Sequence, residues 1–105
     1  MADNRRTSTR HAVSLAGQLG LNGQLQSVTL INLSLGGALV QAGTKFSMGQ
    51  RVTITFSIPT AEHPVEVGAT VRWSDDKATG LQFDGLRARD VWALNKYFES
   101  LPALP

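Results

Sequence analysis

The sequence predicts an all-β fold with one helix, namely a six-stranded antiparallel barrel followed by a C-terminal α-helix. Short segments along the chain alternate apolar and polar residues, which is the period of half-buried strands. Glycine, asparagine and proline signals separate these segments at close intervals, as is typical of a small barrel. The last segment changes to a spacing of three and four, which indicates a helix. A chain of 105 residues suits one domain with one modest core.

The first half of the barrel is predicted to be a hairpin and a short third strand. Residues 12–21 form the first strand and residues 24–32 the return strand. Asn22 and Gly23 join them, because both residue types tolerate the positive φ of a two-residue hairpin turn. Two glycines interrupt the pattern, and residues 38–41 resume it as a short strand.

The second half supplies three more strands. Residues 52–58 and 65–73 alternate strictly, and Pro59 and Pro64 bracket the loop between them. Asp75, Asp76 and Lys77 form a turn before a last short strand at residues 80–83.

The chain is predicted to end in a helix at about residues 88–101. Val91, Leu94, Phe98 and Leu101 recur on one helical face, and Pro102 stops the helix. This apolar face is expected to cover one opening or flank of the barrel.

Charge is concentrated at the N-terminus. Residues 1–11 are predicted to be a flexible basic arm, because Arg5, Arg6 and Arg10 stand against the single acid Asp3. The net charge of +2 does not by itself indicate nucleic-acid binding, but a local cationic arm favours one anionic partner. No apolar run approaches the roughly 20 residues of a membrane helix, and no signal peptide is recognised. Membrane insertion is therefore not expected, and the absence of cysteine fits a cytoplasmic location.

The residues of catalytic and metal sites are not assembled in the sequence. His11 and His63 have no second set of metal ligands near them, and Asp75-Asp76 is read as a solvated turn. Ser34 lacks a nucleophile-elbow pattern. The chain is therefore predicted not to be an enzyme and to need no metal or cofactor.

Two polar motifs remain. Arg6 and Arg10 have the spacing RxxxR, which alone reads as a solvated basic tail. The second motif is Asn32-x-Ser34-x-x-Gly37. In a strand, Asn32 and Ser34 would point outward, and the intervening leucines would point inward. The glycines would leave no Cβ in the way of a ligand, although a β-bulge at a barrel corner explains them equally well.

Taken together, the motifs resemble those of the PilZ domain family. The residues that carry the resemblance are Arg6 and Arg10, followed by Asn32, Ser34 and Gly37. The segments LSLGGALV, TVRWS and TGLQF and the closing helix extend it along most of the chain. The resemblance implies a six-stranded barrel with a C-terminal helix that binds the second messenger cyclic di-GMP.

The resemblance also implies roles for individual residues. Arg6 and Arg10 would contact guanine and phosphate, and Asn32 and Ser34, with the glycine pair Gly36 and Gly37, would form the barrel side of the site. Many family members carry Asp at the position of Asn32, and Asn is an accepted variant, so binding is expected to survive.

Two further residues are candidates for contact with the ligand. Arg5 directly precedes the RxxxR motif, and an arginine there implies that two ligand molecules bind as an intercalated pair. Trp73 has two readings, because it ends a strand whose odd positions look inward, yet it lies beside a turn at the barrel rim. It is either a plug of the core or a platform that stacks on guanine.

The expected mechanism is a switch in which the ligand orders the N-terminal arm and an effector protein reads the altered surface. One alternative is a PilZ-like adaptor that binds protein and no nucleotide. Another is a small barrel that binds single-stranded nucleic acid, which would need exposed aromatics beside a basic groove. DNA and RNA are not expected as partners. Trp92 and Tyr97 on the helix are either a docking patch or part of the packing.

Overall fold

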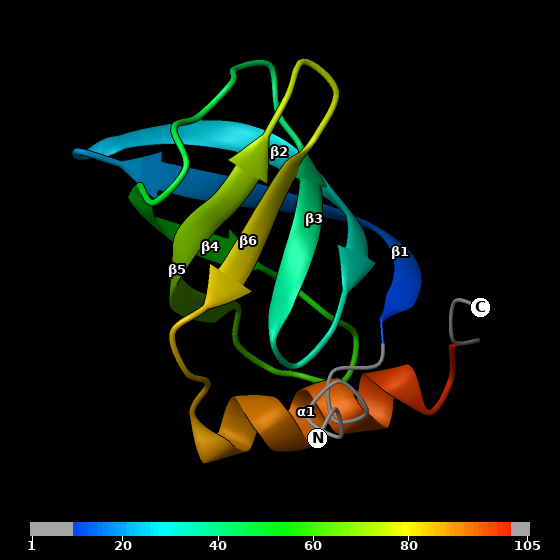
Figure 1. The fold of residues 1–105 in the computed structure, drawn as a ribbon. Coiled ribbons are helices and arrows are strands. Elements are labelled where there is room, and N and C mark those ends of the chain that lie inside the picture. Colours follow the sequence, from blue (N-terminus) through cyan, green and yellow to red (C-terminus); the bar gives the residue numbers. More distant parts are fainter. Residues whose placement is uncertain (1–9, 102–105) are drawn as a thin grey trace, which may run out of the picture.

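The computed structural model describes residues 10–101, in which six antiparallel strands close into a barrel beside one helix (Figure 1). The elements are β1 (His11–Leu21), β2 (Gln24–Leu33), β3 (Gly37–Gln41), β4 (Arg51–Phe56), β5 (Val65–Ser74), β6 (Thr79–Phe83) and α1 (Ala88–Phe98). The predicted fold class is confirmed. The strand boundaries lie within one residue of the predicted ones, except that β4 ends at Phe56, two residues early.

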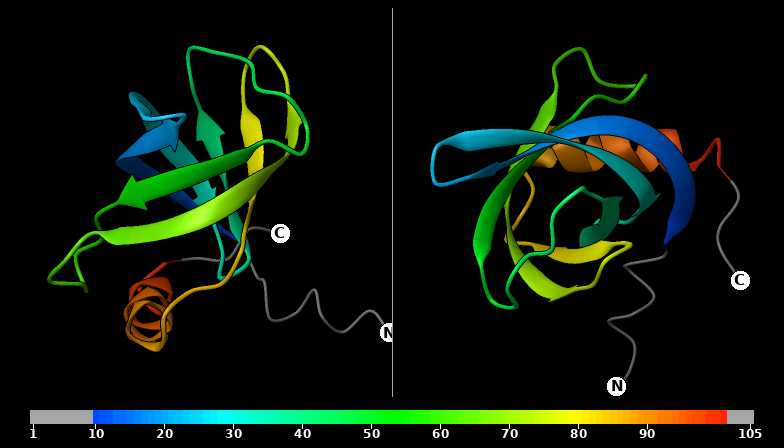
Figure 2. Two further views of the ribbon diagram at one scale, coloured as in Figure 1. Left: turned by 90° about the vertical axis from the view of Figure 1, so that its left-hand side faces the viewer. Right: turned by 90° about the horizontal axis from the view of Figure 1, so that it is seen from above.

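The strand order around the barrel is β1-β2-β3-β6-β5-β4, with β1 paired to β4 to complete the ring. β1 is long enough to take part on both sides, since it pairs along its length with β2 and over residues 17–20 with β4. The pairing of β3 with β6 joins the first three strands to the last three. Figure 2 shows the closed ring seen from above, with α1 behind it.

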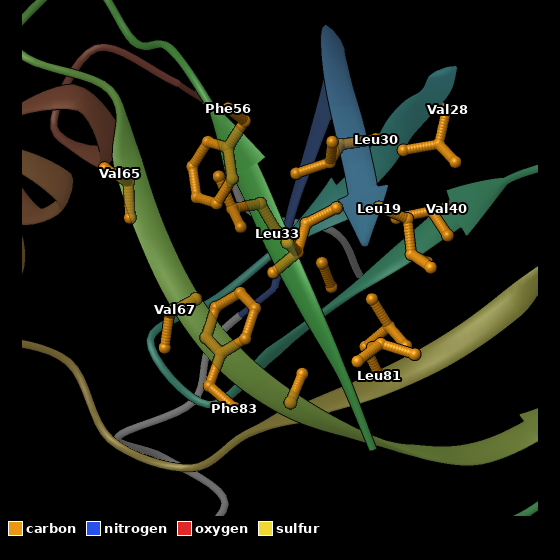
Figure 3. Close-up of a cluster of buried hydrophobic side chains, with 14 of the residues drawn as sticks. Leu19, Val28, Leu30, Leu33, Val40, Phe56, Val65, Val67, Leu81 and Phe83 are labelled. Atoms are coloured by element: carbon orange, nitrogen blue, oxygen red, sulfur yellow. The ribbon is translucent and has the colours of Figure 1, made fainter. Parts of the chain in front are cut away.

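The interior of the barrel is filled by inward-facing aliphatic and aromatic side chains, several of which are shown in Figure 3. This packing explains the alternation from which β4 is predicted. Val52, Ile54 and Phe56 face the core and are buried, whereas Thr53 is exposed. Phe56 also stacks on Phe83 of β6, with ring centroids 6.5 Å apart. Burying the apolar members of each strand is the main source of stability of such a fold.

Helix α1 lies against one end of the barrel (Figure 1). Leu94 is fully buried and Phe98 nearly so. The hydroxyl of Thr60, in the β4–β5 loop, donates to the carbonyl of Ala93 at 2.7 Å and ties that loop to the helix.

One expectation about α1 is corrected, and one alternative that the sequence left open is resolved for Tyr97. The helix ends at Phe98 and not at residue 101, because the next N–H groups form tighter bonds, from Ser100 to Tyr97 and from Leu101 to Phe98. Tyr97 packs against the core, whereas Trp92 is 62% exposed and lies under the Lys96 ammonium, 5.8 Å from the ring centroid.

The hairpin turns lie at the residues from which the sequence predicts them. Asn22 and Gly23 both have positive φ, of 53° and 84°, as the β1–β2 hairpin requires. In the β5–β6 turn, the Asp75 carboxylate accepts hydrogen bonds from the N–H groups of Lys77 and Ala78 at 2.7 and 2.9 Å. These two bonds favour the ionised form of the carboxylate and hold the pKa of Asp75 below its usual value.

Candidate ligand-binding site

The pairing of β1 with β2 brings Arg10, the last residue of the first motif, close to the second motif. His11 lies opposite Leu33 in the antiparallel register. The His11 imidazole is buried and stacks on the Phe98 ring of α1, with ring centroids 4.3 Å apart. His11 therefore belongs to the barrel and not to the predicted arm, and Arg10 directly before it emerges where β2 ends and the second motif begins.

The end of β2 changes the predicted directions of the motif side chains. β2 ends at Leu33, so the strand alternation stops before it reaches Ser34. Asn32 is half-buried, but Ser34, which was expected to point outward, is only 5% exposed. Leu35, which was expected to point inward, is only partly buried against the core. The outward direction predicted for Ser34 is therefore wrong.

The Ser34 hydroxyl holds the β2–β3 turn together. Its Oγ accepts hydrogen bonds from the N–H groups of Gly36 and Gly37, both at 3.1 Å, and donates to the carbonyl of Gly37 at 3.3 Å. A serine hydroxyl has one donor and two acceptor positions, so its capacity is fully used. Ser34 shapes the site through the turn, and its hydroxyl has no free position for a ligand.

Replacing Ser34 with alanine is expected to lower the free energy of unfolding by about 1–2 kcal/mol, because two N–H groups of a tight turn lose their acceptor. Urea unfolding followed by circular dichroism measures this loss. Ser57→Ala is the matched control, since Ser57 is exposed beyond the end of β4. Equal stability of the two variants would contradict the role given to the Ser34 hydroxyl.

Gly37 allows β3 to approach β6 closely. It lies opposite Gln82 in the register, and a Cβ at this position would overlap the carbonyl oxygen of Leu81. Within residues 10–101 the glycines with positive φ are Gly23 and Gly49, so the requirement at Gly37 is steric and not conformational. The missing Cβ thus serves the packing of two strands.

A bulge in β5 turns Trp73 out of the barrel. The register with β6 shifts between Val71 and Trp73, so Arg72 and Trp73 are both exposed while Val71 stays buried. Trp73 is 46% exposed, so the alternative in which its side chain fills the core is wrong. The indole packs directly over Gly80 of β6, where a Cβ would lie only 2.8 Å from Trp73 Cε2. The absence of a Cβ at Gly80 thereby allows the indole to lie there.

These features surround a pocket of about 390 Å³ on the outside of the barrel, within the usual size range of ligand pockets. Its lining consists of Arg10, Asn32, Ser34, Gly36, Gly37, Ala38, Leu39, Arg72, Trp73, Gly80, Leu81 and Gln82. Among these described residues there are two arginines and no carboxylate. The pocket therefore favours an anion, and the partly exposed indole offers a flat face to a base.

The pocket brings together most of the residues proposed from the sequence. The six that line it are Arg10, Asn32, Ser34, Gly36, Gly37 and Trp73. Arg5 and Arg6 lie outside the described residues. Arg72, Gln82 and Gly80 also line the pocket and were not predicted from the sequence, because strict alternation places no emphasis on them. The available signal was the adjacency of Arg72 to Trp73 just before a turn.

Residues 10–101 contain no cluster of three or more His, Asp or Glu side chains suited to hold a metal ion. The described helix is too short and too polar to span a membrane.

Comparison with known proteins identifies the fold. The family model described as PilZ domain matches residues 4–100. The inhibitor of motility MotI/DgrA of Bacillus subtilis superposes with a TM-score of 0.71 at 22% identity, over 91% of this chain and 53% of that one. The PlzA protein of Borreliella burgdorferi, solved in complex with c-di-GMP, superposes with a TM-score of 0.62 at 19% identity, over 93% of this chain and 37% of that one. The chain thus spans about half or less of the length of these structures. No curated protein matches the sequence.

Proposed function

Because this chain belongs to the PilZ domain family, we propose that it is a receptor for cyclic di-GMP and that the pocket beside Arg10 is its binding site. The observation that carries the proposal is the lining of that pocket. Arg10, Asn32 and Trp73 come from segments far apart in the sequence, yet they line one cavity whose described residues include no acid. A structurally similar protein, PlzA, has been solved with the same ligand, which supports this choice of ligand.

The chemistry of the ligand fits these side chains. Cyclic di-GMP carries two phosphates and two guanines. The Arg10 guanidinium grips a phosphate bidentately or pairs with guanine O6 and N7. The Asn32 carboxamide reads a base edge with one donor group and one acceptor group. Trp73 stacks on a guanine, and Ser34 acts indirectly by holding the turn that carries the glycines.

The N-terminal arginines complete the proposed site. Arg5 and Arg6 precede Arg10 by only a few residues, within the same cationic segment. We expect this segment to cover the ligand from the side opposite the barrel. The third guanidinium, at Arg5, offsets part of the charge of the four phosphates of an intercalated ligand pair and stacks on an outer base.

Signalling follows from a change of surface. A ligand that bridges the N-terminal segment and the barrel favours the conformation in which both are joined. An effector protein that prefers this conformation then binds more tightly when the ligand is present.

The proposal is tested by calorimetric titration of cyclic di-GMP into the intact protein. Binding with a stoichiometry near two is expected for an intercalated pair, and a value near one would exclude the pair while leaving the receptor function intact. Absence of any heat or spectroscopic change would overturn the function and favour an adaptor that binds only protein. Competition with a single-stranded oligonucleotide of equal charge is the control, and it is expected to displace no ligand.

Trp73 is expected to report ligand binding through its fluorescence. The chain has two tryptophans, so Trp92→Phe leaves Trp73 as the only tryptophan, and excitation at its red edge avoids the emission of Tyr97. Stacking on guanine places the indole against an electron-rich base, and its emission should fall on titration with cyclic di-GMP. Unchanged emission at a ligand concentration that saturates the calorimetric signal would remove Trp73 from the site.

A further inference from the structure

Arg72 and Gln82 line the pocket, although neither belongs to either sequence motif. Both side chains are exposed, on the adjacent strands β5 and β6. They also line a neighbouring depression of about 500 Å³ on the same side of the barrel. The two hollows therefore share a wall, and Arg72 is the cation of that wall.

The charge of Arg72 is not compensated by the residues that surround it. The neighbouring depression holds one acid, Asp84, and this carboxylate is paired with Arg51. Within residues 10–101, no carboxylate forms an ion pair with Arg72. Arg51 and Asp84 neutralise each other, so the net positive charge of the shared wall rests on Arg72.

The fold also places Arg72 across the pocket from Arg10. Arg10 enters from the β1–β2 side, Arg72 stands on β5, and β3 and β6 lie between these strands in the barrel order. The two guanidinium groups thus approach the pocket from opposite ends. The β5 bulge keeps Arg72 on the same outward side as Trp73, so the cation and the aromatic platform are neighbours.

We propose that Arg72 is a further ligand-binding residue that holds a phosphate of the cyclic dinucleotide from the barrel wall. This inference rests on the proposed function and deepens it. The motif arginines then bind the end of the ligand near β2, and Arg72 binds the end near β5. A guanidinium is suited to this role because it forms two parallel hydrogen bonds to a phosphate and keeps its charge at every physiological pH.

The test compares the affinity of the full chain for cyclic di-GMP with that of three variants. Arg72→Ala is expected to weaken binding about 10- to 100-fold, the range for losing hydrogen bonds to a charged group. Its affinity should also depend less on salt concentration than that of the wild type, because one screened charge interaction is gone. Arg72→Lys keeps the charge without the bidentate geometry and is expected to lie between the two. Arg87→Ala removes an equally exposed arginine outside the pocket and should stay within about twofold of wild type.

The outcomes separate this inference from the function on which it rests. If the wild type binds and Arg72→Ala binds within about twofold of it, the role of Arg72 is overturned while the receptor function stands. If the wild type does not bind cyclic di-GMP, the function fails, and inorganic pyrophosphate becomes the probe. A shift of the Trp73 indole N–H resonance with pyrophosphate that Arg72→Ala abolishes would still support an anion site at Arg72. No shift in the wild type, or an equal shift in both proteins, would overturn it.

Discussion

Replacing Arg10 with alanine is expected to weaken cyclic di-GMP binding about a hundredfold, equivalent to close to 3 kcal/mol. Arg10 is the motif arginine that the structure places at the pocket, and it is exposed, so its loss should leave the barrel intact. The large effect has two causes. A phosphate or guanine loses a bidentate partner, and the pocket loses one of the two cations that its lining contains.

The measurement is a calorimetric titration of wild type, Arg10→Ala and Arg10→Lys, with thermal unfolding to show that all three are folded. The lysine variant separates charge from geometry, because an ammonium keeps the charge but cannot form the planar two-bond contact. We expect it to recover only part of the lost affinity. An alanine variant that binds as tightly as the wild type would show that the ligand lies elsewhere.

Replacing Gly37 with alanine is expected to lower the free energy of unfolding by about 2–3 kcal/mol, the upper range for overpacking a well-packed site. The added Cβ would overlap the carbonyl oxygen of Leu81 and would stand 3.3 Å from the Cα of Gln82. Both atoms are backbone, so they cannot move aside as a flexible side chain would. The β3–β6 pair must separate instead, at the seam that joins the two halves of the barrel.

Urea unfolding of Gly37→Ala beside Gly43→Ala tests this expectation. Gly43 is the matched control, because a Cβ there would meet only the Gln26 carboxamide at an ordinary 3.9 Å, and its φ is not in the left-handed region. The control should unfold close to the wild-type midpoint. If both variants are equally stable, the close approach of β3 and β6 does not depend on Gly37. Ligand affinity of Gly37→Ala should fall as well, since the strands that form the floor of the pocket are displaced.

The barrel could be predicted from the sequence because its strands are short and one-sided. Val52, Ile54 and Phe56 alternate with polar residues in the chain. They are buried in the structure because every second side chain of the strand faces the core. Turn residues with special backbone needs, such as Asn22 and Gly23, marked where strands reverse. Such local signals locate elements well, and pairing between neighbours in the chain follows from them.

The site could be predicted only in part, because its side-chain directions depend on where regularity stops. Ser34 lies just past the end of β2, and Trp73 just past a bulge in β5, so period-two reasoning misplaced the first and left the second ambiguous. Both irregularities lie in connections between strands that are neighbours in the chain, and a strict period of two contains neither a bulge nor an early strand end. Regular alternation already places Arg72 outward, and only the bulge turns Trp73 to the same side and makes the pair visible as part of one site.

The closed ring of strands restricts how an effector protein can recognise this domain. Every strand in the described part of the chain has a paired neighbour on both sides over part of its length, so no strand offers a continuous free edge for strand addition by a partner peptide. Recognition is therefore expected to rely mainly on side chains of the outer surface, on loops or on α1. A partner bound in this way selects shape and charge, and these are the properties that a docked dinucleotide with two phosphates changes most. The same closure limits the commonest route to edge-to-edge aggregation, while the pocket beside Arg10 lies on the outer surface of the ring.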